Sequence, residues 1–143
     1  MTMNLYILRH GIAVEPGTRG YEKDADRPLT PEGERVALHV LRAHRLWELY
    51  LADELGVPID RVHEQAERAE HSLTRQQLDR LSASMGHPEL DPHGDPIPGK
   101  LGQIAAVDYQ TLAECDLHQT WRIARVTAQD ADFLQTLRRL GLT

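Results

Sequence analysis

The sequence has one cysteine, few aromatic residues and no long apolar run. Because Cys115 is the only cysteine, no disulfide can form within the chain, and we expect a reducing, cytoplasmic location. Aromatic residues make up 5% of the 143 residues, so the core must be built mainly from Leu, Ala, Val and Ile. No apolar stretch approaches about twenty residues, and the N-terminus lacks the pattern of a signal peptide. The sequence therefore predicts no association with a membrane.

Positive charge is also scarce. The chain has 16 Lys and Arg against 22 Asp and Glu, which gives a net charge of −6. Because sequence-independent binding of nucleic acid requires a basic face, this composition argues against it. The length allows one domain, or one core with small satellites.

The pattern of caps and apolar residues predicts a mainly helical fold of about three helices. Thr30 and Pro31 are typical of an N-cap and a first helical residue, and apolar spacing extends this first helix to about residue 55. Asp60 is a candidate cap for a second helix over 61–71. Thr74 and Gln77 form a capping box for a third helix.

Other segments are predicted to lie outside these helices. Residues 86–99 contain four prolines and three glycines, which favours a structured loop or a linker. An apolar run over 4–8 predicts an N-terminal β-strand. Residues 120–127 alternate like a strand, and 130–140 are amphipathic, so the tail is expected to be a small, incomplete α/β unit.

Imidazole and carboxylate side chains recur at helical spacing between residues 44 and 71. They are His44 and Glu48 on the first predicted helix, and His63, Glu67, Glu70 and His71 on the second. Positions i, i+4, i+7 and i+8 share one helix face. Such ligands without a thiolate favour Mn²⁺ or Fe²⁺, although Zn²⁺, Co²⁺ and Ni²⁺ also bind them. Since coordination needs neutral imidazole, we expect affinity to fall below about pH 6.

Two alternatives concern the same segment. Arg61, Glu64 and Arg68 also lie on the second helix, so ion pairs four residues apart could explain its charges without a metal. The pattern Glu67-x-x-Glu70-His71 approaches that of the inverted zinc proteases, but Glu67 stands where they have histidine. We therefore do not predict catalytic zinc.

Four segments carry a family resemblance: residues 29–33, 44–48, 62–71 and 86–98, the last including Asp91-Pro92-His93-Gly94-Asp95-Pro96-Ile97-Pro98. They resemble the metal-binding and dimerisation domain of the iron- and manganese-dependent repressors, the diphtheria toxin repressor family. The resemblance continues more weakly over Leu112–Thr143, which is similar to the first part of that family's SH3-like domain. It suggests three regions: 1–28, a helical domain over 29–100, and a truncated SH3-like unit over 101–143.

The resemblance implies a ligand set and a partner. The metal ligands would be His44, Glu67, Glu70 and His71, with Glu48 and His63 as ancillary ligands. A carboxylate at position 67 matches the manganese sensors, where iron sensors have cysteine, and the implied cofactor is Mn²⁺ or Fe²⁺. The helical domain implies a homodimer, or a heterodimer with a full-length repressor. Residues 1–28 do not resemble the family's winged helix-turn-helix, so direct DNA binding is not expected.

The N-terminus suggests a second, different chemistry. Residues 3–33 resemble the start of a phosphohistidine phosphatase of the histidine phosphatase superfamily, on the strength of Arg9-His10-Gly11 after an apolar run. In that family His10 would be the nucleophile and Arg9 a phosphate ligand. The family's later Ser-Pro-x-x-Arg block is not recognisable, and a strand and loop without chemistry is the other interpretation. The two resemblances together suggest a composite chain. The main prediction is a dimerising metalloregulator module, and the alternative is a phosphoryl hydrolase.

Overall fold

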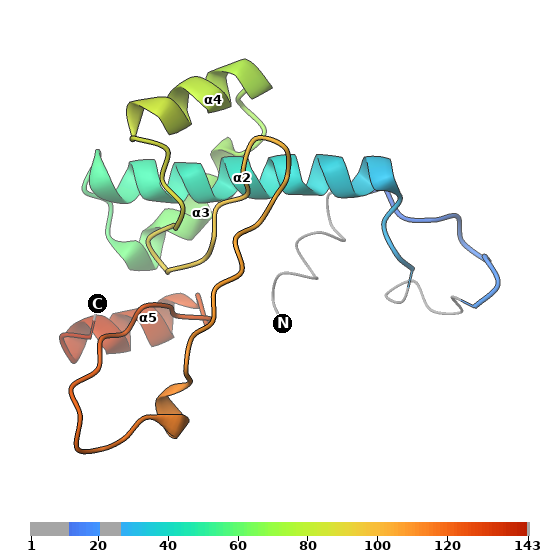
Figure 1. Ribbon diagram of the computed structural model, residues 1–143. Coiled ribbons are helices and arrows are strands. Elements are labelled where there is room, and N and C mark those ends of the chain that lie inside the picture. The colour runs from blue at the N-terminus through green and yellow to red at the C-terminus, as the bar shows by residue number, and fades with distance from the viewer. Residues whose placement is uncertain (1–11, 21–26, 143) are drawn as a thin grey trace.

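The computed structural model describes residues 12–20 and 27–142, and this part of the chain is mainly helical (Figure 1). Its helices are α2 (Pro31–Asp53), α3 (Ile59–Ala69), α4 (Arg75–Ser84) and α5 (Ala131–Arg139), with a short 3-10 helix η2 (Leu112–Glu114). The long α2 contacts both α3 and α4. The tail runs away from α2, turns at η2 and returns, so that α5 packs against α3 (Figure 1).

The helix starts follow the expected capping chemistry. The Thr30 hydroxyl accepts a hydrogen bond from the Gly33 N–H at 3.0 Å, and Pro31 is the first residue of α2. Thr74 and Gln77 form the reciprocal capping box that begins α4. Asp60 is not the cap of α3: the helix starts after Pro58, and Asp60 lies in its first turn.

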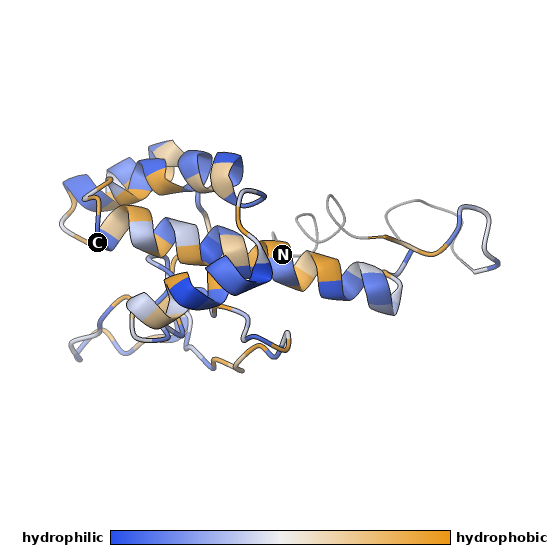
Figure 2. Cartoon of the chain, turned by 90° about the horizontal axis from the view of Figure 1, so that it is seen from above, coloured by the Kyte–Doolittle hydropathy of each residue, from blue (hydrophilic) through white to orange (hydrophobic). Residues whose placement is uncertain are grey.

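The core is aliphatic and lies on both sides of α2. One cluster of buried residues joins α2 to α4 and the loop after it, and comprises Ala43, Leu46, Leu78 and Ile97. The other joins α2 to α3 and comprises Leu51, Val62 and Ala66. Hydrophobic and hydrophilic residues are interspersed along the helices (Figure 2). Because α3 packs on one side of α2 and α4 with its following loop packs on another, polar side chains on the buried surface of α2 have little freedom to move.

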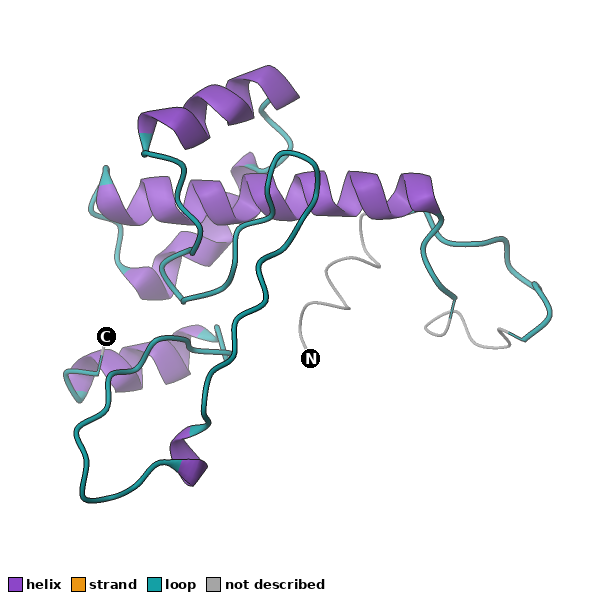
Figure 3. Cartoon of the chain, in the orientation of Figure 1, coloured by secondary structure: helices purple, strands orange, loops and turns teal. Residues whose placement is uncertain are grey.

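The predicted strands differ from the observed fold. The expected strand over 4–8 lies outside the described residues. Residues 120–127 do not form a strand, and Figure 3 shows helices and loops alone in the described part of the chain. Isolated bridges pair Ala13 with Leu29 and Leu90 with Pro96. An alternating pattern needs a neighbouring strand edge to become a sheet; here the Val126 N–H donates instead to the carbonyl oxygen of His93, in a loop.

No described helix combines the length and apolar character needed to span a bilayer. Four helices, rather than about three, account for the described fold, because the amphipathic tail segment forms α5 and packs on α3. Within residues 101–142, all of which the structure describes, the expected SH3-like unit is not shown.

Candidate metal centre

His44 and Glu48 lie one turn apart on α2, and both side chains are almost fully buried. The Glu48 Oε1 atom is 3.0 Å from His44 Nε2 and 3.0 Å from His63 Nδ1. The two imidazole nitrogens are 3.1 Å apart. His63 comes from α3, and the packing of Val62 and Ala66 against α2 brings it to this position.

Glu70 is the second carboxylate that His44 contacts. His44 Nδ1 is 2.8 Å from Glu70 Oε2, and the other oxygen, Oε1, is 3.3 Å from His71 Nε2. The Glu70 side chain is buried, whereas that of His71 is 58% exposed. Since α3 ends at Ala69, Glu70 is its C-cap and His71 lies in the following turn. His44 therefore connects Glu48 and His63 on one side of its ring to Glu70 on the other.

Glu67 is half-buried on α3, one turn before His71. One group of three candidate ligand atoms that lie within 4.8 Å of one another belongs to His44, Glu48 and His63. Among the described residues, no such group of three includes Glu67, Glu70 or His71. Metal–ligand bonds of about 2.0–2.4 Å allow ligand atoms to lie up to about 4.8 Å apart, so a divalent cation fits the group of His44, Glu48 and His63.

A second group surrounds the other oxygen of Glu48. It comprises Glu48, Asp91 and His93, all buried, with ligand atoms within 4.8 Å of one another. His93 Nδ1 is 3.8 Å from Glu48 Oε2 and 4.0 Å from Asp91 Oδ1. The His93 side chain is 0% exposed, yet neither of its ring nitrogens has a hydrogen-bond partner among the described residues. Buried polar atoms without partners are rare and costly, and a bound cation would satisfy one of these two nitrogens.

Sequence reasoning missed Asp91 and His93 as candidate ligands. They lie more than forty residues after Glu48 in a loop rich in proline and glycine, where no helical spacing signals a ligand. The available signal was the chemistry of the loop itself, in which an aspartate and a histidine stand two residues apart. The fold brings them to α2 because Ile97, in the same loop, packs into the core against that helix.

The electrostatics of the centre reflect buried carboxylates beside imidazoles. Burial alone would lower the pKa of His44, but hydrogen bonds and charges from Glu48 and Glu70 raise it to about 9. Burial opposes ionisation of Glu48, yet hydrogen bonds from His44 and His63 hold its pKa far below the usual range. Burial and then the negative charge of Glu48 raise the pKa of Asp91 to about 6. Without a cation, protons therefore compensate the carboxylates.

The ligand atoms are nitrogens and carboxylate oxygens without sulfur. This set suits Mn²⁺, Fe²⁺ and related divalent cations rather than metals that need thiolates. Each oxygen of Glu48 faces a different group of candidate ligands.

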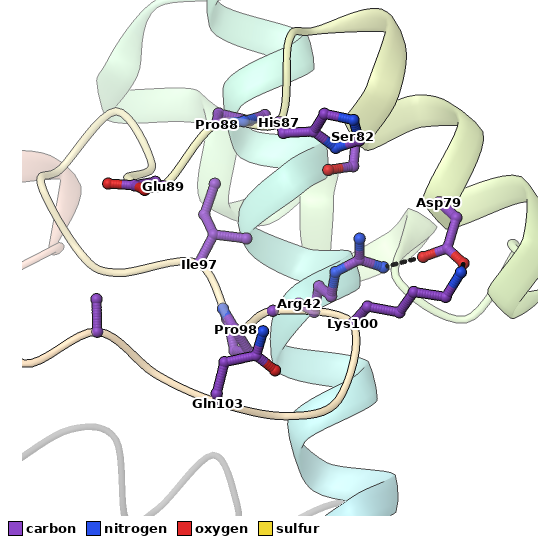
Figure 4. Close-up of a pocket in the computed structure, with 12 residues that line it drawn as sticks. Arg42, Asp79, Ser82, His87, Pro88, Glu89, Ile97, Pro98, Lys100 and Gln103 are labelled. Carbon is purple, nitrogen blue, oxygen red and sulfur yellow. Dashed lines mark hydrogen bonds and ion pairs between the residues drawn. The ribbon is translucent and has the colours of Figure 1, made fainter.

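A separate cavity lies between α2, α4 and the loop after α4 (Figure 4). Its volume is about 410 Å³, and it is lined by Arg42, Asp79 and Lys100, among others. Asp79 accepts a hydrogen bond from Arg42 at 3.0 Å and pairs with Lys100 at 2.9 Å. Asp79 therefore links Arg42 and Lys100 in an ion-pair network at the edge of the cavity. None of the candidate metal ligands described above lines this cavity.

The helical region is similar to known proteins. Residues 30–99 match the family model described as "Iron dependent repressor, metal binding and dimerisation domain". The diphtheria toxin repressor of Corynebacterium glutamicum is 41% identical over 81 residues, which cover 57% of this chain and 35% of that protein. The iron-dependent repressor IdeR of Mycobacterium leprae is 37% identical over 100 residues, which cover 70% of this chain and 41% of that protein. The chain thus spans about two fifths or less of the length of these relatives.

A solved structure supports the same assignment. A manganese-dependent transcriptional repressor in complex with manganese aligns with a TM-score of 0.73 and 38% identity, over 82% of this chain and 55% of that chain. Every candidate ligand described above lies within residues 30–99. The comparisons give no support to the phosphatase resemblance of residues 3–33. Arg9 and His10 lie outside the described residues.

Proposed function

We propose that residues 30–99, which match the metal-binding and dimerisation domain of the iron-dependent repressors, bind Mn²⁺ or Fe²⁺ around Glu48 and Glu70. The chain would act as the self-associating module of a metal-dependent transcriptional regulator. The homologues are themselves iron- or manganese-dependent repressors. The residues that hold the metal, and the role of the whole protein, are our proposals.

Glu48 carries this proposal, because each of its oxygens faces imidazole nitrogen. Oε1 lies 3.0 Å from both His44 and His63, and Oε2 lies 3.8 Å from His93, whose ring nitrogens have no hydrogen-bond partner in the part of the chain that the structure describes. A side chain that is 1% exposed and surrounded by three imidazoles is unusual for a purely structural glutamate. The arrangement supports one cation on each side of the carboxylate.

The proposed primary ligands are His44, Glu67, Glu70 and His71, with Glu48 and His63 as ancillary ligands. The contacts of Glu70 with His44 at 2.8 Å and with His71 at 3.3 Å support this set. A carboxylate at position 67 favours manganese over a metal that prefers sulfur. Asp91 and His93 extend the set on the other side of Glu48.

A divalent cation bound here would supply the positive charge that the buried carboxylates need. These carboxylates come from different elements: Glu48 from α2, Glu70 from the end of α3, and Asp91 from the loop after α4. Cations on the two sides of Glu48 would therefore hold these separate elements together. As partner we propose a second copy of this chain, with a full-length repressor as the alternative partner; we do not propose that this chain binds an operator by itself.

Titration with Mn²⁺, and with Fe²⁺ in the absence of oxygen, tests the proposal. At a free metal concentration 100 times Kd, binding to the native state stabilises it by about 2.7 kcal/mol, which raises Tm measurably. Glu48→Gln should weaken binding, because the change removes the charge shared by both groups. The double variant Glu70→Ala with His71→Ala should abolish binding at the primary set.

Glu64→Gln is the matched control. Glu64 lies on α3 beside the candidate ligands, but its side chain is 73% exposed and pairs with Arg68. This variant should bind metal as the unaltered chain does. If Glu48→Gln and the double variant both bind Mn²⁺ with unchanged affinity, the proposed centre is wrong.

A further inference from the structure

Residues 124–129 of the tail, here called the tail clasp, lie against the loop that carries Asp91 and His93. The Val126 N–H donates to the carbonyl oxygen of His93 at 2.8 Å. Arg125 Nε donates to Asp95 Oδ1 at 2.6 Å, and Gln129 Nε2 donates to Asp95 Oδ2 at 3.0 Å. Both carboxylate oxygens of Asp95 are therefore bound by the clasp.

The approach of the clasp depends on a glycine in the loop. Gly94 has φ of +83°, and the space that a Cβ would fill there is occupied by the carbonyl oxygen of Ala124. A side chain at position 94 would be strained by its backbone angle and would also collide with the clasp. Loop and clasp, about thirty residues apart in sequence, are thus in close backbone contact.

Asp95 connects the clasp to a candidate ligand. The backbone N–H groups of His93 and Asp95 donate to Asp91 Oδ1 at 2.8 and 2.9 Å. On the inner side, the buried Arg45 donates to the carbonyl oxygen of Pro96 and lies 3.5 Å from Asp91 Oδ2. The loop is therefore held between Arg45 of α2 and the clasp, with the Asp91 carboxylate oriented by the loop's own backbone.

We propose that the tail clasp positions Asp91 and His93 for metal binding, with Asp95 and Arg125 as the positioning residues. This inference rests on the proposed function, because it concerns the half of the metal centre on the Oε2 side of Glu48. Neither Asp95 nor Arg125 is a ligand. Their ion pair fixes the loop backbone, and that backbone sets where the Asp91 carboxylate and the His93 ring lie. By linkage, a metal bound at these residues strengthens clasp docking by the same factor by which docking strengthens metal binding.

Arg125→Ala in the full chain tests the inference, with Arg125→Lys as the conservative variant. The number and affinity of bound Mn²⁺ ions are measured by calorimetry, and His93→Ala identifies which binding event belongs to the Oε2 side. We expect Arg125→Ala to weaken that event about 10- to 100-fold, as the loss of residues that orient ligands usually does. Arg125→Lys should restore part of the affinity, and the event at His44, Glu48 and His63 should keep its affinity.

Hydrogen exchange of the metal-free chain provides a readout that does not depend on bound metal. The amides of His93, Asp95 and Val126 should exchange faster in Arg125→Ala than in the unaltered chain, because their acceptors are no longer held. Arg138→Ala is the control: the exposed Arg138 of α5 pairs with the largely buried Asp60 of α3, and this pair includes no residue of the loop or the clasp. It should change neither the exchange of these amides nor metal binding.

The outcomes separate the two proposals. If the unaltered chain binds no Mn²⁺, the proposed function fails, and the inference fails with it. If the unaltered chain binds Mn²⁺ on both sides of Glu48 and Arg125→Ala binds it with the same affinities, the inference alone is overturned.

Discussion

His44 is the residue that contacts both carboxylates of the proposed centre. Its two ring nitrogens face different carboxylates, Glu48 and Glu70, at 3.0 and 2.8 Å. A neutral imidazole offers one lone pair, so His44 cannot coordinate through both nitrogens without losing a second proton. Coordination by one nitrogen would leave the other N–H to donate to a carboxylate, an arrangement common among metal-binding histidines.

The raised pKa of His44 predicts how Mn²⁺ affinity depends on pH. Glu48 and Glu70 outweigh burial and raise this pKa from 6.5 to about 9 in the metal-free chain. A metal must then displace a proton at every pH below about 9, so apparent affinity should rise up to tenfold per pH unit between pH 7 and 9. Calorimetry in buffers of different ionisation enthalpy measures both the affinity and the proton released. Constant affinity across this range, with no proton release, would contradict the assignment of His44 as a ligand.

The same shift predicts the stability of the metal-free chain. Because the pKa of His44 is raised on folding, its contribution to stability is fully present below about pH 6.5 and is lost as pH rises through about 9. Chelator-treated protein should therefore have a lower free energy of unfolding at pH 9 than at pH 6.5, as measured by urea denaturation. In His44→Gln this decrease should be much smaller, and an equal decrease would show that other groups cause it.

At the scale of the element, α2 determines both stability and the metal centre. Leu46 is fully buried between α2 and α4, two residues before Glu48. The local signals that define helices were strong, since the caps at Thr30 and Thr74 appear as expected. The expected strand in the tail did not form, because alternation describes a side-chain pattern and not the presence of a neighbouring strand.

Leu46→Ala should destabilise the chain by about 2–5 kcal/mol, since the change leaves a cavity in a closely packed core. Leu55→Ala is the matched control, because Leu55 follows α2 and is 58% exposed. The control should change stability by about 0.5 kcal/mol or less. Denaturant unfolding of both variants measures the difference. Similar small effects at both positions would mean that Leu46 does not lie in the core.

At the scale of the whole molecule, the proposed partner is a second copy of the chain. The match of residues 30–99 to a dimerisation domain predicts sedimentation as a dimer that dissociates on dilution. A monomer at all concentrations, with and without Mn²⁺, would contradict the proposed homodimer.

The whole molecule also accounts for the functional residues that the sequence did not predict. His44, Glu48, His63 and Glu70 were recognisable because helical spacing places ligands on predictable faces. Asp91 and His93 were not, because they reach Glu48 only when the loop after α4 folds back onto α2.

Local sequence signals were enough to predict the main helices, the caps at Thr30 and Thr74, the nitrogen and oxygen character of the candidate ligands and the family resemblance of residues 29–98. These properties depend on local backbone preferences and on side-chain chemistry, which are present in the chain before it folds. The folded arrangement was needed to show that Glu48 lies between two groups of candidate ligands, and that the tail contacts the loop beside one of them. Both arrangements depend on contacts between residues distant in sequence, and such contacts arise only when the core brings α2, α3 and the loop together.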